Sequence, residues 1–289
     1  MNSAGVTRNF QDACQLVAKE RKIFVPPLLL FAVNTLFLFP LWRTGSPNPV
    51  VDSSPVALLV VNLLVFIFTI LQYGWLFALI TSLVQQRPLE LRQSMAKALP
   101  LSVHMFALGI CISILLTVLW LLSSSLFAIE IASFRLIRGL SGLSMYLALF
   151  GLFVGFLLTG ILVIAILFLL LASPFAGPVL ALERVGPLAA LKIVLLFVKS
   201  HLLFALGMDC LSGFIFLFSL LPLCVLLLLK GADWLPQAIR QSSPLYLFAS
   251  QIYSLFLMGI STLVLVSYSL GYSRQSARIN PTPSQEPSQ

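Results

Sequence analysis

Charged residues are scarce in this chain: its 289 residues include 17 Lys or Arg and 9 Asp or Glu, which is 9% of the total. A soluble domain carries about 25% charged residues, and so few charges cannot form its polar surface. Cysteine is also rare, with four residues and no CxxC spacing, which excludes a disulfide-stapled domain. The 16 glycines and 17 prolines follow no period, which excludes a collagen-like chain.

Long apolar runs dominate instead, since 60% of the residues are hydrophobic and the mean hydropathy is +1.05. About 20 apolar residues in a helix cross the roughly 30 Å hydrocarbon core of a membrane. The sequence therefore predicts an all-α, polytopic integral membrane protein with six transmembrane helices. The predicted crossings are 23–42, 56–84, 101–129, 142–175, 201–229 and 246–272.

Lys and Arg are distributed unevenly over the segments between these crossings. With the N-terminus inside, the inner segments hold twelve Lys or Arg and the outer loops five. The positive-inside rule then places both termini in the cytoplasm and predicts a multi-pass protein of the cytoplasmic membrane. Residues 1–22 are expected to form a cytoplasmic amphipathic segment, and residues 273–289, rich in Ser, Pro and Gln, a disordered tail.

The inner segments before the first, third and fifth crossings are each predicted to form a short amphipathic helix at the membrane interface. In the third, Gly186 to Ser200, Lys192 and Lys199 share one stripe because they lie seven residues apart. This segment is either interfacial or a re-entrant helix. The fourth run is longer than one crossing requires, and Pro174 and Pro178 are expected to mark a bend where it ends.

Asp209 is the acid predicted to lie well inside a crossing, and such residues face the interior of a helix bundle. One interpretation is a proton- or cation-coupling carboxylate. The other is a structural residue that fixes helix packing through a polar partner; the candidates are Asn34, Asn62, Gln72 and Gln251.

His104 and His201 lie near the inner ends of the third and fifth crossings and could face each other. Together with Asp209 they form the candidate intramembrane polar site. No third ligand, HExxH motif or Cys/His cluster accompanies them, so no metal site is expected. Gly151 and Gly155 form a GxxxG motif, continued in spacing by Thr159, which predicts close packing of the fourth crossing on another helix.

Motifs for hydrolases, ATPases and dinucleotide-binding enzymes are missing from the sequence. No catalytic residue, cofactor or cofactor-binding residue is expected, and the net charge of +8 favours anionic lipid over nucleic acid as the partner. A low-ranked alternative is an intramembrane enzyme that uses His104, His201 and Glu183.

A turn motif follows the fourth crossing, with Pro178, Glu183, Gly186, Pro187 and Lys192 as its marked positions. The stretch from Pro174 to Lys192, PFAGPVLALERVGPLAALK, resembles a segment of bacterial six-helix membrane proteins related to the membrane domain of glycerophosphodiester phosphodiesterases. The resemblance implies a six-helix layout in which Gly186-Pro187 begins an interfacial helix. It implies no phosphodiesterase activity, because the soluble catalytic domain of those enzymes has no counterpart in this sequence.

These observations lead to two hypotheses from different functional classes. The first is a non-enzymatic scaffold or accessory subunit that engages anionic lipid on the cytoplasmic face, a membrane-protein partner or a second copy of itself. The second is a small transporter or permease in which Asp209 is the coupling carboxylate.

Overall fold

The described part of this computed structural model is helical throughout and comprises residues 4–43, 55–88, 90–137, 142–231 and 243–279. Five of its helices are long and apolar enough to cross a membrane, which identifies a multi-pass membrane protein. Their candidate spans are Leu63–Val84, Leu91–Arg135, Leu143–Glu183, Leu202–Leu221 and Ile252–Ala277. These spans overlap the predicted second to sixth crossings.

Nine helices are described, one of them a 3₁₀ helix. In chain order they are α1 (Ala4–Lys19), the 3₁₀ helix η1 (Arg21–Phe24), α2 (Val25–Arg43), α3 (Pro55–Val84), α4 (Leu91–Ile137), α5 (Leu143–Glu183), α6 (Pro187–Ser200), α7 (Leu202–Gly231) and α9 (Ser243–Ile279). The first predicted crossing, 23–42, forms η1 and α2, and within α2 the side chains of residue 34 and of residues 36–43 lie outside the described residues.

Two helices extend past the predicted boundaries. Helix α5 continues beyond residue 175, through Pro174 and Pro178, to Glu183. Proline 174 removes the amide donor for the carbonyl of Leu170, and the hydroxyl of Ser173 donates to that carbonyl at 2.9 Å instead. Helix α9 also extends past the predicted start of the tail at 273, to Ile279, and Arg274 bonds to α1; residues 280–289 lie outside the described part.

The predicted amphipathic segments differ in how they join the crossings. Helices α1 and α6 are separate from α2 and α7, whereas the segment before the third crossing is continuous with it in α4, despite Pro100. Helix α6 buries one face, formed by Ala190, Val194, Phe197 and Val198, and both of its lysines are exposed.

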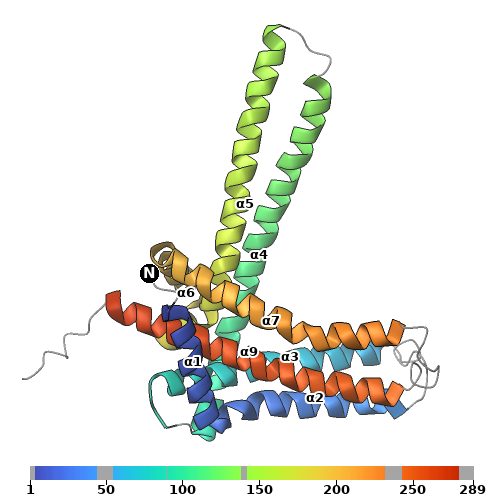
Figure 1. The fold of residues 1–289 in the computed structure, drawn as a ribbon, viewed down its shortest axis with the longest axis vertical. Helices are drawn as coiled ribbons and strands as arrows, with labels where there is room; N and C mark the ends of the chain where they lie inside the picture. Colours follow the sequence, from blue (N-terminus) through green and yellow to red (C-terminus); the bar gives the residue numbers. More distant parts are fainter. Residues whose placement is uncertain (1–3, 44–54, 89, 138–141, 232–242, 280–289) are drawn as a thin grey trace, which may run out of the picture.

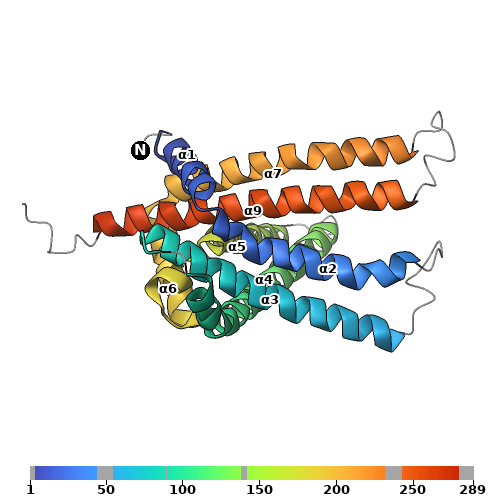
Figure 2. The same cartoon turned by 90° about the horizontal axis from the view of Figure 1, so that it is seen from below.

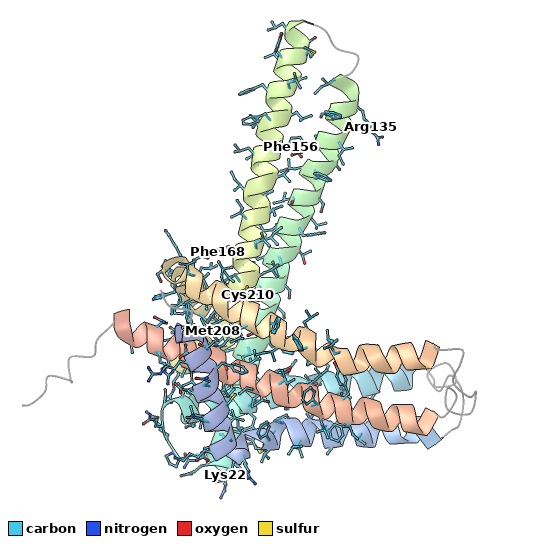
Figure 3. The ribbon with its side chains drawn as sticks, viewed as in Figure 1. Lys22, Arg135, Phe156, Phe168, Met208 and Cys210 are labelled. Carbon is cyan, nitrogen blue, oxygen red and sulfur yellow. The ribbon has the colours of Figure 1, made fainter. Side chains whose placement is uncertain are left out.

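The long helices form two groups. Helices α2, α3, α7 and α9 run side by side. The α4–α5 hairpin projects away from them at a wide angle, so its far end is separated from the far ends of the other four helices (Figures 1 and 2). At 1.5 Å per residue, the 41 residues of α5 extend about 60 Å. Side chains stand out along both helices of the hairpin (Figure 3), and many of its apolar ones are exposed.

The core lies where the hairpin meets the other helices. The end of α5, with Phe175 and Val179, packs against α6, the first turns of α7, and Tyr268 and Tyr272 of α9. A second cluster joins α1 and η1 to α3 and α9 around Ala13, Ile23 and Leu79. The first cluster joins the hairpin to α6, α7 and α9, and the second joins α1 and η1 to α3 and α9.

Helices α3 and α4 approach each other closely at Gly74. A Cβ atom added to Gly74 would lie 2.6 Å from the carbonyl oxygen of Ala98 and 2.9 Å from the amide nitrogen of Ser102, and would also meet the Ser102 hydroxyl. Only glycine permits this separation of the two backbones.

Candidate functional site

Asp209 is held by a hydrogen bond across two membrane-spanning helices. The hydroxyl of Tyr268, from α9, donates to the Oδ1 atom of Asp209, from α7, and Ser212, one turn further along α7, bonds to the same hydroxyl. The ring of Tyr268 packs edge-on against Phe175 of α5, with centroids 4.8 Å apart. Only 3% of Tyr268 is exposed, so its hydroxyl has few alternatives to this partner.

The partner of Asp209 differs from the four candidates named from the sequence. Gln72 is buried in α3, and its Oε1 atom has no hydrogen-bond partner among the described residues. The side chains of Asn34, Asn62 and Gln251 lie outside the described residues. Tyr268 escaped the sequence analysis because tyrosine is common in apolar helices and lies 59 residues from Asp209.

A cavity of about 470 Å³ opens beside this pair, between α3, α5, α7 and α9. Its lining combines the polar groups of Asp209, Tyr268, Ser212, Tyr73 and Ser261 with an apolar remainder that includes Pro174, Phe216 and Val264. A site of this composition offers one acidic group and several hydroxyls to a small polar or cationic solute. Across the described ranges, no three His, Cys, Asp or Glu side chains are placed to hold a metal ion.

Within the described residues, each of His104 and His201 contacts groups close to it in sequence. The Nδ1 atom of His104 lies 2.7 Å from the carbonyl oxygen of Pro100, and its ring lines a different cavity. His201 stacks on Phe197 with centroids 4.9 Å apart, and its Nδ1 atom lies 2.8 Å from the hydroxyl of Ser200. Both rings therefore have local partners, and the suggestion that the two histidines face each other stays a prediction.

The turn motif joins three helices. Pro178 is buried within α5, and Glu183 ends that helix and accepts a hydrogen bond of 2.9 Å from the hydroxyl of Tyr272 in α9. Gly186 is the N-cap of α6 and Pro187 its first residue, a position where the missing amide donor costs nothing. Lys192 is exposed.

The two glycines of the GxxxG motif have different surroundings. A Cβ atom at Gly151 would meet nothing within 4 Å, whereas one at Gly155 would lie 3.2 Å from the side chain of Glu130 in α4. The hydroxyl of Thr159 donates to the Oε1 atom of Glu130 at 2.7 Å. Packing at this motif thus involves Gly155 and Thr159, within the α4–α5 hairpin.

Glu130 is a buried acid that the sequence analysis missed. Only 4% of the residue is exposed, and its Oε2 atom has no hydrogen-bond partner in the described structure. The predicted third crossing ended one residue earlier, which placed Glu130 at the membrane surface. The signal was present, because Ile131, Ala132 and Phe134 continue the apolar run beyond it.

Three cysteines have side chains within the described part of the chain. Cys14, Cys111 and Cys210 are free thiols. Partial burial raises the pKa of the Cys14 thiol above its usual range, which lowers the fraction of the reactive thiolate.

Comparisons of this chain with protein-family models, with curated proteins and with solved structures found no match.

Proposed function

We propose that this chain is a non-enzymatic scaffold or accessory subunit of the cytoplasmic membrane, with both termini in the cytoplasm, whose basic end engages anionic lipid or a membrane-protein partner. The proposal is supported by one observation above all, which is the gathering of basic residues at one end of the molecule. The resemblance of the turn motif to six-helix membrane domains agrees with this proposal and adds no chemistry to it.

The basic end, as we call it, comprises α1, η1, the turn between α3 and α4, the start of α4, the turn between α5 and α6, α6 itself and the last turns of α9 (Figures 1 and 2). It carries Arg8, Lys19, Arg21, Lys22, Arg87, Arg92, Lys97, Arg184, Lys192, Lys199 and Arg274. A positive surface at the ends of membrane-spanning helices attracts anionic lipid headgroups, and it favours a cytoplasmic location for this end.

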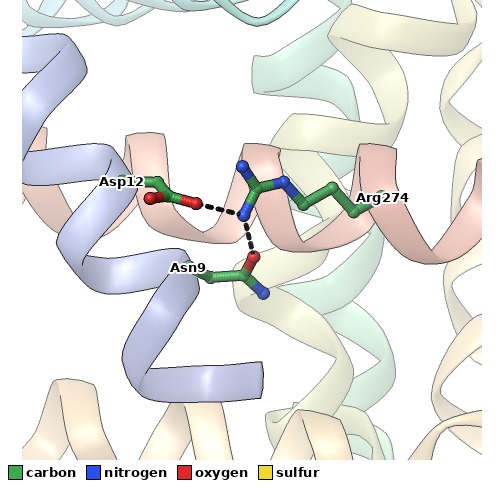
Figure 4. A network of polar contacts seen from close by, with 3 residues as sticks. All are labelled: Asn9, Asp12 and Arg274. Carbon is green, nitrogen blue, oxygen red and sulfur yellow. Dashed lines mark hydrogen bonds and ion pairs between the residues drawn. The ribbon is translucent and has the colours of Figure 1, made fainter. Parts of the chain in front are cut away.

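Side-chain contacts fix the elements of the basic end to one another. The Nη1 atom of Arg274 lies 2.7 Å from the Oδ1 atom of Asn9 and 2.7 Å from the Oδ2 atom of Asp12, which ties α9 to α1 (Figure 4). Tyr272 ties α9 to the end of α5 through Glu183. A basic surface built from bonded helices has a defined shape, which suits a scaffold better than loose basic loops do.

The transporter hypothesis is the second candidate, and the cavity beside Asp209 favours it. A carboxyl group that faces a cavity between four helices is the arrangement that coupling by protons or cations requires. In that case Asp209 exchanges the cation and the hydroxyl of Tyr268 bonds to the carboxyl group in one of its states.

One experiment separates the two candidates. The tagged full-length chain is extracted from native membranes in mild detergent, and co-purifying proteins and lipids are quantified by mass spectrometry, for wild type and for Asp209→Asn. A scaffold yields a partner at fixed ratio or a strong enrichment of anionic lipid, equally in both proteins. The scaffold hypothesis is refuted if neither a fixed-ratio partner nor an enrichment of anionic lipid is recovered. Proton-dependent solute flux is measured in parallel, and its loss in the well-folded Asp209→Asn variant supports the transporter.

A further inference from the structure

A second cavity, of about 370 Å³, lies at the basic end between α3, α4, the end of α5 and the turn into α6. Three basic side chains line it, namely Arg87, Lys97 and Arg184, together with His104, and no acidic residue is among its described lining residues. Thr81, Ser82 and Gln85 add side chains that form hydrogen bonds. The chemistry of this cavity is therefore that of an anion site.

The three cations come from three separate elements. Arg87 follows α3, Lys97 belongs to the first turns of α4, and Arg184 is the C-cap of α5, so only the folded chain brings them together. None of the three forms an ion pair or a side-chain hydrogen bond with any of the described residues. By contrast, Arg274 at the same end is paired with Asp12. Like charges around one cavity repel each other, and a bound anion removes that repulsion.

The backbone is strained at the rim of this cavity. In the part of the chain that the structure describes, two residues other than glycine have a positive φ: Gln86, at 54°, and Arg184, at 53°. Gln86 lies between the lining residues Gln85 and Arg87, and Arg184 is itself a lining residue. Glycine adopts this conformation at lower cost, and strain of this kind clusters at binding sites.

The remaining walls add two features. Gly186 lines the cavity and caps α6, so the positive end of the α6 dipole lies at its edge. Ala78, Leu101, Leu180 and Val185 contribute apolar surface. Cations together with apolar surface, at the ends of membrane-spanning helices, fit an amphiphile with an anionic head better than a small hydrated anion.

We propose that this cavity binds the phosphate group of an anionic phospholipid, with Arg87, Lys97 and Arg184 around the phosphate and the apolar wall beside the glycerol and first acyl carbons. Basic pockets between transmembrane helices take lipid headgroups in this manner. The inference deepens the proposed scaffold function, on which it rests for the lipid source, by naming the lipid class and its site. Free phosphate shares the headgroup chemistry, so the test must distinguish the two.

The test measures binding of short-chain phosphatidylglycerol, phosphatidylcholine and inorganic phosphate to the purified full-length chain in neutral detergent, by native mass spectrometry and calorimetry. Arg184→Gly is the principal variant, because glycine removes the guanidinium and also relieves the positive φ. Gln86→Gly is its matched control, since it relieves the same strain and keeps every charge. Lys192→Gln controls for net charge, because Lys192 lies on α6 and does not line the cavity.

We expect wild type, Gln86→Gly and Lys192→Gln to bind phosphatidylglycerol alike, and Arg184→Gly to bind it about tenfold more weakly, as loss of one charge-assisted contact predicts. Lys97→Gln, an exposed helical position, gives the same loss without any backbone change and covers the case in which Arg184→Gly misfolds.

Equal binding by the cavity variants and both controls overturns the proposal. Binding of phosphate that depends on Arg184 without any preference for phosphatidylglycerol overturns the lipid assignment. These outcomes are distinct from failure of the scaffold function, which is judged by co-purification from native membranes.

Discussion

Substituting Gly74 by alanine tests the closest helix contact in the fold. The added methyl group would overlap the backbone of α4, at the Ala98 carbonyl oxygen and the Ser102 amide nitrogen. Because backbone atoms cannot rotate away, α3 and α4 must separate. Overpacking of this kind costs about 1–3 kcal/mol, while alanine gains about 1 kcal/mol over glycine in a helix.

Gly109→Ala is the matched control that isolates the overlap. Gly109 also lies in an apolar helix, and a Cβ atom there would meet nothing within 4 Å. Both variants gain the same helix propensity, so the free energy of unfolding of Gly74→Ala should lie about 1–3 kcal/mol below that of Gly109→Ala.

The assay is equilibrium unfolding by a denaturing detergent, followed by circular dichroism in mixed micelles. Adding Ser102→Ala to Gly74→Ala should restore only part of the loss, because the clashes with backbone atoms persist. Equal stability of the Gly74→Ala and Gly109→Ala variants would refute the close approach of α3 and α4.

Three further substitutions test individual polar contacts. Thr159→Val leaves the buried Glu130 carboxyl without its hydrogen-bond donor, so the same unfolding assay should show a loss of about 1–3 kcal/mol, which an unchanged midpoint would contradict. Arg274→Gln should change global stability by less than about 1 kcal/mol, because its pair with Asp12 is partly exposed, but should speed hydrogen exchange in α1; unaltered α1 exchange counts against that anchor. Tyr272→Phe should lower stability by about 0.5–1.5 kcal/mol and speed exchange at the end of α5, and no change at either would exclude a stabilising role for its hydroxyl.

The sequence predicted the helices well because length and hydropathy decide them locally. Five of the six predicted crossings overlap the candidate spans, and Gly186-Pro187 begins α6 as expected. Helices α5 and α9 extend past the predicted boundaries, to Glu183 and Ile279. Arg274, in the last part of α9, bonds to α1, a contact that composition alone does not reveal.

The candidate sites were less predictable because they depend on contacts between distant segments. Asp209 could be identified from the sequence as an acid inside a crossing, but its partner, Tyr268, is a tyrosine among many apolar residues. The cations of the basic end were counted only for orientation, since Arg87 and Arg184 lie almost a hundred positions apart and nothing local pairs them. The positive φ of Arg184 could not be predicted either, because the residue at this position is not a glycine.

Helix α4 is continuous from Leu91 to Ile137 and therefore joins distant parts of the molecule. One helix of 47 residues carries Lys97 at the cavity proposed to bind a phospholipid, contacts Gly74 through Ala98 and Ser102, and forms half of the projecting hairpin. From the contact at Ser102 to Ile137 the helix extends about 50 Å, so a rotation of about 2° about that contact moves the far end of the helix by about 2 Å. A phospholipid bound as proposed beside Lys97 would contact the same uninterrupted helix that extends to Ile137, with no loop between the two positions.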